Sequence, residues 1–481
     1  YYTLWYRSDR CSADLRHDYY YSDSLFDHAA TEYDDKLALA TLGMAAAADS
    51  SWESDQYYWM TGEVGRAAHI RDAFAKLGFA EVQLFNYTHS LNDAPDTAAC
   101  AVARKTLVRG GRQVTIIGAF VRGSGYGAEW SGNLHTGSGS AHTGFVAAAR
   151  QLTEKIRGYV QASAKRQPLG TLKLWMGGYS RGAAVANLLA ARVNKELPGL
   201  ERENVFVYTF ATPVALGPQD YPNLQQDYDN NHNADGSLKE SWGESNIFNI
   251  ISSGDIVPHL LPEEWSFHRN GNDRFLPSTR NEEELEDLNE MGKNDFGPTP
   301  LDFSWLATDK ETDEVMLRME EYFISRENYH EKYEAALMDM TQCAFIRSEE
   351  EVTQNKVLDD GEVIQRLRTL THLKNMDYWK ISRAVWAAST MSRAVLKRVD
   401  AENIPIRAQQ IVVPILAVGL CYDLESEAVS LIAKYILMFV AMKSAPDDAI
   451  RAAFCHHCEN YIALMEYYAP SEHCMEATTR T

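Results

Sequence analysis

The chain has 481 residues, of which 45% are hydrophobic, and a formal net charge of −21 at pH 7. This length allows a large buried core and several domains, and the composition is typical of a globular protein. The negative charge argues against nucleic acids and anionic membrane surfaces as partners. The uncharged stretch 408–422 has 15 residues and contains Pro414, so we interpret it as a buried helix that is too short to span a bilayer.

The sequence begins Tyr1-Tyr2-Thr3, without an initiator methionine or a hydrophobic leader. We interpret this start as processed or truncated, and it favours a secreted or extracytoplasmic protein. The seven cysteines are sparse and odd in number, so they define neither a disulfide framework nor a redox compartment.

The first 110 residues carry no pattern that indicates chemistry. Two stretches have the spacing of helices, 32–48 with an apolar side and 69–77, and 81–85 is typical of a short strand. We expect this N-terminal segment to pack on the core that follows.

A strongly apolar stretch, 113–121, predicts a buried strand. The loop after it, 122–127, is rich in glycine. It lacks the Walker lysine and the G-x-G-x-x-G spacing, so it does not indicate a phosphate site. Apolar residues at alternating steps of four and three predict an amphipathic helix over 145–160.

The most informative stretch is 171–193, where a buried strand, a turn and a helix follow one another. The turn is Gly178-Tyr179-Ser180-Arg181-Gly182, the G-x-S-x-G pattern of a nucleophile elbow. Such a turn lifts the serine hydroxyl clear of the sheet, and the positions two before and two after it are too crowded for a side chain. The pattern also arises by chance, but the strand before it and the helix after it favour a nucleophile at Ser180.

Two further buried strands are predicted at 205–212 and 246–252, and a polar surface loop lies between them at 229–243. Asp255 follows the second of these strands. Open parallel sheets keep functional residues at the carboxyl ends of their strands, so we predict a role for this carboxylate. The alternative is a turn residue that binds its own backbone.

From residue 263 the pattern becomes mainly helical. The acidic run 282–287 is interpreted as a solvated face or a mobile segment. Longer helical patterns follow at 313–340, 361–373, 378–399 and 425–442. The stretch 447–468 is also helical, and the tail after Pro470 is expected to be disordered.

Together these pieces resemble the class 3 lipases, which are serine hydrolases of the α/β-hydrolase fold. The matching blocks are VTIIGAFVRGS (114–124), HTGF (142–145), GGYSRGAAVANLLA (177–190), VYTFATP (207–213) and NIISSGDIVPHLLP (249–262). Two more elements are similar to a bacterial branch of the family, EWSGNL (129–134) and an H-x-x-E-x-Y pattern at 456–461.

The resemblance implies an α/β-hydrolase core, a mostly parallel sheet flanked by helices. We therefore divide the chain into four parts. The N-terminal segment 1–110 packs on the core 111–262, which holds the elbow and the triad aspartate. The segment 263–450 is a large α-helical insertion or cap, and 451–481 is a C-terminal helix that returns the triad histidine, followed by the tail.

The resemblance also implies a catalytic triad of Ser180, Asp255 and His456, with oxyanion donors at Arg181 and Ser124. Asp255 and His456 lie 201 residues apart, whereas typical members place the histidine much closer to the aspartate. This separation is the reason for predicting the insertion.

The chain has 14 histidines that compete for the role of base. His456 fits the H-x-x-E-x-Y pattern at the start of the last predicted helix, and His457 would point about 100° away around that helix. His268 is the next alternative. His142 and His259 adjoin positions that the fold uses for packing and turns.

The run CHHC at 455–458 contains residue types that bind metal ions, so a metal site has to be considered. A zinc site normally has four ligands, and only His473 and Cys474 lie nearby in the sequence. We predict no metal and no cofactor.

The sequence thus predicts hydrolysis of carboxylic esters, with acylglycerol-type lipid esters first, through an acyl-enzyme. The alternatives are an acyltransferase or phospholipase with the same triad, or a catalytically silent protein that binds a lipid or a partner. We expect a lipid or small ester as substrate, no nucleic acid and no integral membrane segment. The oligomeric state is unknown, although the helical block is a candidate oligomerisation surface.

Overall fold

The structure is a computed structural model. It describes residues 1–8, 11, 13–49, 67–87, 97–123, 143–197, 199–216, 244–255, 257–259, 268–277, 281–306, 455–468 and 470. The predicted loop 229–243, the four helical patterns between 313 and 442 and the tail after Pro470 lie outside these residues.

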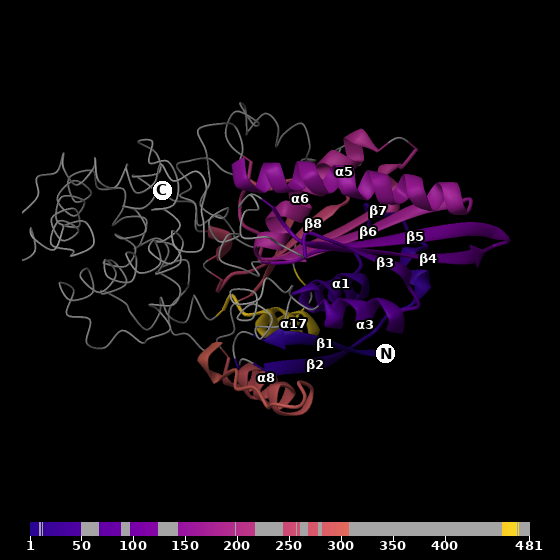
Figure 1. Ribbon diagram of the computed structural model, residues 1–481. Coiled ribbons are helices and arrows are strands. Elements are labelled where there is room, and N and C mark those ends of the chain that lie inside the picture. The colour runs from indigo at the N-terminus through magenta and orange to yellow at the C-terminus, as the bar shows by residue number, and fades with distance from the viewer. Residues whose placement is uncertain are drawn as a thin grey trace, which may run out of the picture.

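The core is a seven-stranded sheet in the order β3-β4-β5-β6-β7-β8-β9 (Figure 1). Its strands are β3 (Ala80–Phe85), β4 (Cys100–Arg109), β5 (Arg112–Val121), β6 (Thr171–Tyr179), β7 (Val205–Phe210), β8 (Ile247–Ser252) and β9 (Asn272–Leu276). β3, β4 and β5 pair antiparallel, and the strands from β5 to β9 pair parallel. The parallel strands therefore end at one edge of the sheet, where the loops after β5, β6 and β8 begin.

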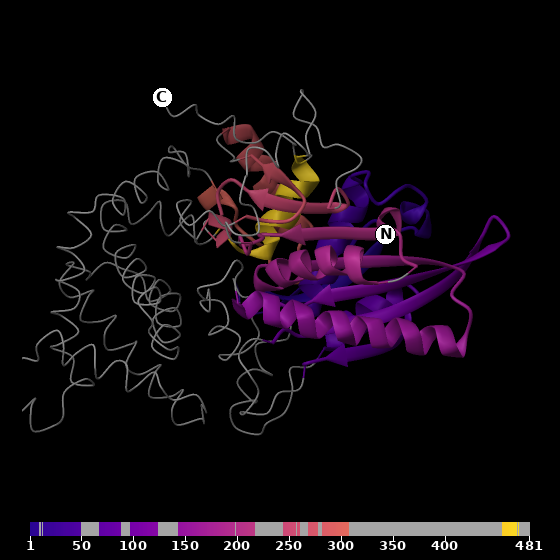
Figure 2. The same ribbon diagram turned by 90° about the horizontal axis from the view of Figure 1, so that it is seen from above.

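Helices cover both faces of the sheet (Figures 1 and 2). α5 (Thr143–Arg166) and α6 (Arg181–Glu196) lie side by side on one face and enclose an apolar core with it. α1 (Asp35–Ala48), α3 (Ala68–Lys76) and a separate hairpin, β1 (Tyr2–Ser8) with β2 (Ala13–Tyr19), lie on the other face. This is the predicted α/β-hydrolase core, a mostly parallel sheet between layers of helices.

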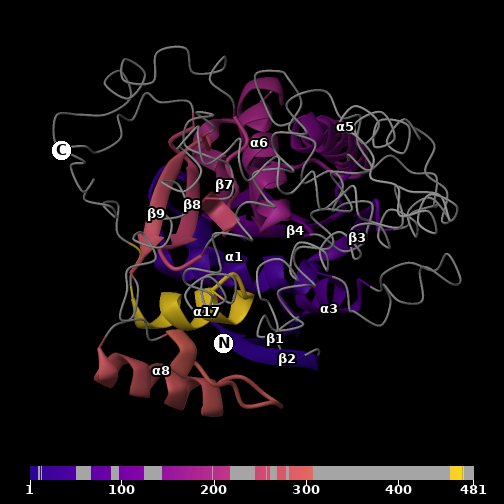
Figure 3. The same cartoon turned by 90° about the vertical axis from the view of Figure 1, so that its left-hand side faces the viewer.

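The remaining described elements are short or lie late in the chain. They are η1 (Asp23–Phe26), η2 (Arg202–Asn204), η3 (Val257–His259), α8 (Glu282–Asn294), η5 (Ser304–Leu306) and α17 (Cys458–Tyr467). α17 packs against α1 and α8, beside the β1–β2 hairpin (Figure 3). The C-terminal helix is therefore part of the layer that covers the core sheet.

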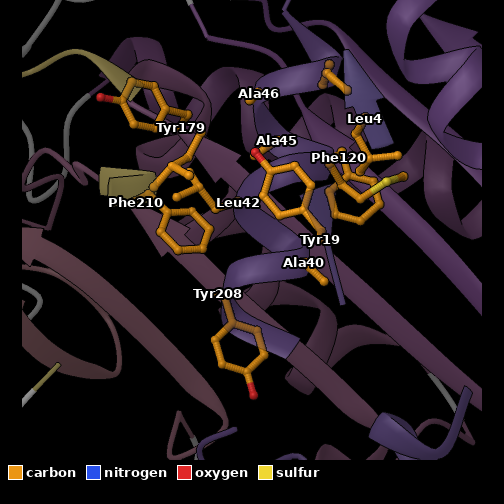
Figure 4. Close-up of a cluster of buried hydrophobic side chains, with 14 of the residues drawn as sticks. Leu4, Tyr19, Ala40, Leu42, Ala45, Ala46, Phe120, Tyr179, Tyr208 and Phe210 are labelled. Atoms are coloured by element: carbon orange, nitrogen blue, oxygen red, sulfur yellow. The ribbon is translucent and has the colours of Figure 1, made fainter. Parts of the chain in front are cut away.

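α1 is buried almost all round, whereas the sequence indicated one apolar side. From Leu37 to Ala48 only Leu39 is not fully buried. Small residues make this possible: at Gly43 an added Cβ would lie 2.8 Å from the Tyr19 ring. Figure 4 shows α1 side chains packed among aromatic rings of the sheet and the hairpin. The helix is thus a central element of this layer rather than a surface helix.

Trp175 of β6 anchors α1 to the sheet. Its ring is fully buried. It contacts the rings of Tyr21, Phe26, Phe79 and Phe120 at centroid distances of 4.9 to 6.0 Å. The indole Nε1–H donates to Thr41 Oγ1 of α1 (2.8 Å). This hydrogen bond satisfies the one polar atom of a large buried side chain.

The predicted strands and helices that fall on described residues are confirmed, with ends shifted by a few residues. Strands β1, β2, β4 and β9 were not predicted, because their residues include many charged or polar ones. The prediction that residues from 263 onward leave the core is wrong for β9, which is the last strand of the sheet. The rest of the proposed insertion, from residue 307, lies outside the described residues and stays a prediction.

Two other interpretations can be compared with the structure. The acidic run 282–287 starts α8, with Glu282 and Glu283 exposed, which confirms a solvated face. The prediction that His456 starts the last helix is wrong by two residues, because α17 begins at Cys458 and the histidine lies in the turn before it.

Replacing Thr41 by valine tests the anchor of α1. We expect Thr41→Val to lower the free energy of unfolding by about 1 to 3 kcal/mol, because the Trp175 indole N–H would stay buried without its acceptor. Thr106→Val is the matched control, since Thr106 is exposed on β4 and should change stability by less than about 0.5 kcal/mol. Urea denaturation measures both. Equal stability of the two variants would contradict this role for Thr41.

Candidate active site

Ser180 lies in the turn between β6 and α6. Its backbone has φ 54° and ψ −125°, which a residue with a side chain rarely adopts. The amide N–H donates to the carbonyl oxygen of Phe210 at the end of β7 (3.0 Å). Backbone strain of this kind costs about 1 to 3 kcal/mol and is typical of functional sites. The side chain stays half-buried at the edge where the parallel strands end.

The two glycines of the elbow allow this turn. A Cβ on Gly178 would lie 2.3 Å from the carbonyl oxygen of Gly182. A Cβ on Gly182 would lie 2.4 Å from the Val121 oxygen and 2.7 Å from the Arg122 oxygen. The prediction that only glycine fits at both positions is confirmed. The close approach at Gly182 also brings the start of α6 against the end of β5.

His456 reaches Ser180 from the far end of the chain. Its Nε2 atom lies 2.8 Å from Ser180 Oγ. Its Nδ1 atom lies 2.9 Å from Asp255 Oδ2 and 3.1 Å from Oδ1. With the ring proton on Nδ1, the imidazole donates to the carboxylate and accepts from the serine hydroxyl. The histidine side chain is 23% exposed, whereas the aspartate side chain is fully buried.

Asp255 is completely buried, at the carboxyl end of β8. Besides the imidazole, its carboxylate accepts from the Tyr461 hydroxyl (2.7 Å) and from the Val257 amide N–H (2.9 Å). A buried carboxylate is tolerated only when it is well hydrogen-bonded, and here three donors surround it. The contact with Val257 is the turn interaction of the alternative interpretation, and the same carboxylate also binds the histidine.

Tyr461 of α17 ties the aspartate to strand β8. Its hydroxyl donates to Asp255 Oδ2 and accepts the amide N–H of Ser252 (3.1 Å). Burial, with the neighbouring Asp255 charge, raises the pKa of Tyr461 well above its usual value. The phenol therefore stays protonated and remains a donor to the carboxylate.

The end of β5 supplies the other side of the site. The Gly123 amide N–H donates to the Asp49 carboxylate at the end of α1 (2.8 Å). Arg181 is the first residue of α6, and its buried guanidinium donates a hydrogen bond to the carbonyl oxygen of Thr97 (2.6 Å). Ser124, the second predicted oxyanion donor, lies outside the described residues. The structure thus places Arg181 beside the strand end from which the predicted oxyanion loop departs.

Arg269 holds the loop that follows Asp255. Its guanidinium donates to the carbonyl oxygens of Pro258 (2.7 Å) and Thr212 (2.5 Å) and to the Asp273 carboxylate (2.8 Å). One side chain thus links the ends of β7 and β9 to the turn η3. Three charge-assisted bonds of this kind give a rigid support for the aspartate.

The other candidate bases are placed elsewhere. His457 occupies the N-cap position of α17 without a side-chain capping hydrogen bond, and the described hydrogen bonds to Ser180 Oγ and Asp255 come from His456 instead. His268 pairs through its backbone with Leu216 in an antiparallel bridge. His142 lies outside the described residues, and only the backbone of His259 is described, in η3.

The described part of the chain contains no cluster of three or more His, Cys, Asp or Glu side chains that could hold a metal ion. None of its helices is long and apolar enough to cross a membrane.

Several residues of the site were not predicted. Tyr461 had a signal, since it is the tyrosine of the H-x-x-E-x-Y pattern. Asp49 and Arg269 had none, because each acts on a backbone group of a segment distant in sequence, and such contacts leave no motif.

Comparison with known proteins relates the part of the chain that holds Ser180 and Asp255 to one family. Residues 120–265 match the family model described as lipase (class 3). Among solved structures, the chain is similar to the Rhizomucor miehei lipase propeptide complex, with 18% identity over 55% of this chain and 70% of that one and a TM-score of 0.32. It is also similar to lipase II from Rhizopus niveus, with 14% identity over 49% and 80% of the two chains and a TM-score of 0.30. None of the curated proteins matches the chain.

An alanine at the elbow tests the crowding at Gly182. We expect Gly182→Ala to lower the free energy of unfolding by about 1 to 3 kcal/mol, because the new methyl group meets backbone oxygens that cannot move freely. Gly158→Ala is the control, since nothing lies within 4 Å of an added Cβ there and the residue is inside α5. The free energy of unfolding of this control should rise by about 0.5 to 1 kcal/mol. A Gly182→Ala protein as stable as the wild type by thermal denaturation would contradict the elbow geometry.

Proposed function

We propose that the protein is a carboxylic ester hydrolase that cleaves acylglycerol-type lipid esters through a triad of Ser180, His456 and Asp255, and the match of residues 120–265 to the class 3 lipase family supports this proposal. The observation that carries this proposal is the continuous chain of hydrogen bonds from Ser180 Oγ through the imidazole to the buried carboxylate. A protein that only binds a lipid has no need of that arrangement.

In the first step the Ser180 hydroxyl attacks the ester carbonyl carbon. His456 Nε2 takes the hydroxyl proton, and the Asp255 carboxylate stabilises the imidazolium that forms. Because this carboxylate is held by three donors, it keeps the imidazole oriented with Nε2 towards the serine. The imidazolium then gives its proton to the leaving alcohol, and the acyl group stays on Ser180.

The oxyanion of the tetrahedral intermediate would bind the backbone N–H groups of Arg181 and Ser124. The first of these lies at the N-terminus of α6, where the helix dipole favours negative charge. The contact of Gly182 with the Val121 and Arg122 oxygens supports the second, since it holds α6 beside the strand that leads into Ser124. Asp49 steadies the same strand end through the Gly123 amide.

In the second step water takes the place of the alcohol. His456 removes a proton from the water, which attacks the acyl carbon, and Ser180 leaves with the proton. The helical cap and an extracytoplasmic location remain predictions from the sequence, which makes no prediction of the acyl chain length.

Hydrolysis of p-nitrophenyl esters from acetate to palmitate tests the proposed triad. We expect Ser180→Ala and His456→Ala to lower kcat by a factor on the order of 10⁴ or more, because each removes a group that acts on the reacting atoms. His457→Ala is the matched control, since it changes the neighbouring histidine and should keep activity within about threefold of the wild type. The dependence of the rate on acyl chain length separates a lipase from a short-chain esterase.

Two results would contradict the proposal. One is a Ser180→Ala protein that keeps most of the wild-type rate. The other is loss of activity in His457→Ala with activity retained in His456→Ala, which would assign the base to the other histidine.

A further inference from the structure

The proposed base, His456, lies far from the other two triad members in the sequence. Ser180 and His456 are 276 residues apart, and the histidine lies in a turn rather than in a helix. Hydrogen bonds inside a helix do not fix such a turn, so its position depends on contacts with the core. The described contacts of this turn therefore decide where Nε2 points.

The residue before the nucleophile makes one of these contacts. The Tyr179 hydroxyl donates to the backbone carbonyl oxygen of His456. The Tyr179 ring also lies against the imidazole, with centroids 5.5 Å apart and planes inclined by 34°. The ring also packs at a right angle to the Tyr461 ring, with centroids 5.7 Å apart. The Tyr179 side chain thus contacts both the backbone and the side chain of His456.

The residue before the acid makes a second contact with the same turn. Gly254 packs so closely on Cys455 that an added Cβ would lie 2.9 Å from its Sγ atom. The Cys455 side chain is buried. The turn that carries His456 is therefore held by Tyr179, which precedes Ser180, and by Gly254, which precedes Asp255.

We propose that Tyr179 is a positioning residue for the base, which places the His456 imidazole by binding the backbone carbonyl of the same residue. The inference rests on the proposed function of His456. Among the described contacts the Tyr179 hydroxyl binds His456 and not Ser180 Oγ, so we infer that it acts on the reaction through the histidine. Its phenol remains a donor, because burial raises the pKa of Tyr179 well above its usual value.

The expected effect is kinetic. A small displacement of a catalytic group lowers the rate of the chemical step far more than it lowers substrate binding. Without the hydroxyl, the turn at 455–457 loses its hydrogen bond to the elbow, and the Nε2–Oγ geometry is less well defined. The loss should therefore appear in kcat, while KM stays nearly constant.

Tyr179→Phe tests this directly, because it removes the hydroxyl and keeps the ring. We expect kcat for p-nitrophenyl esters to fall about tenfold, the change that corresponds to one hydrogen bond, with KM within about twofold of the wild type. The rate of labelling by a small fluorophosphonate should fall by a similar factor, since labelling also requires the base.

Tyr159→Phe is the matched control. Tyr159 is also buried, and its hydroxyl also donates to a backbone carbonyl, that of Glu81 (2.9 Å), but it lies on α5 away from the site. Both variants should lose similar stability, and only Tyr179→Phe should lose kcat. Equal kcat in the two variants would overturn the inference.

A second pair of variants moves the turn without touching Tyr179. Gly254→Ala should lower kcat, because its methyl group pushes on Cys455 Sγ. The double variant Gly254→Ala/Cys455→Ala removes that sulfur and should recover most of the loss. Failure of the double variant to recover kcat would overturn the view that the position of this turn limits the rate.

These outcomes are distinct from failure of the proposed function. If the wild type neither hydrolyses any ester nor reacts with the fluorophosphonate, the proposed function is overturned and the role of Tyr179 with it. If the wild type is active and Tyr179→Phe matches it, only the inference about Tyr179 is overturned.

Discussion

The buried carboxylate of Asp255 is the constraint on which the rest of the site depends. A fully buried negative charge is tolerated only when hydrogen-bond donors surround it. Removing one partner of such a group lowers the free energy of unfolding by about 3 to 5 kcal/mol. The donors here come from the next turn of the chain and from the segment 455–461, more than 200 residues later. The carboxylate therefore couples closure of the C-terminal segment on the core to assembly of the site.

The surrounding packing makes this closure specific. α17 lies between α1 and α8, and His17 of β2 binds Glu466 near its end (2.8 Å). Tyr461 then connects α17 to the end of β8, and Tyr179 connects the turn before α17 to the end of β6. On the opposite side, Arg269 fixes the turn after the aspartate. The nucleophile follows β6, the acid follows β8 and the base precedes α17, and the three meet where the parallel strands end.

The sequence was informative wherever a residue type is demanded by local geometry or by a repeated pattern. The glycines around Ser180 and the apolar runs of β5 to β8 identified the elbow, most of the parallel sheet and the position of Asp255. Strands with polar or charged residues, such as β4 and β9, carried no such pattern, because neighbouring strands rather than their own residues determine their pairing. The contacts of Asp49, Arg269 and Tyr179 with distant backbone carbonyl and amide groups also depend on tertiary structure. His456 was selected over His457 only through a family resemblance, since the two adjacent histidines are equivalent by any local criterion.

The proposed mechanism requires Ser180 to be a nucleophile that His456 activates. Treating the protein with a fluorophosphonate and mapping the adduct by peptide mass spectrometry measures this in one step. We expect a single adduct on Ser180 that forms slowly or not at all in His456→Ala. An adduct on another serine, or labelling of Ser180 at the wild-type rate in His456→Ala, would contradict it.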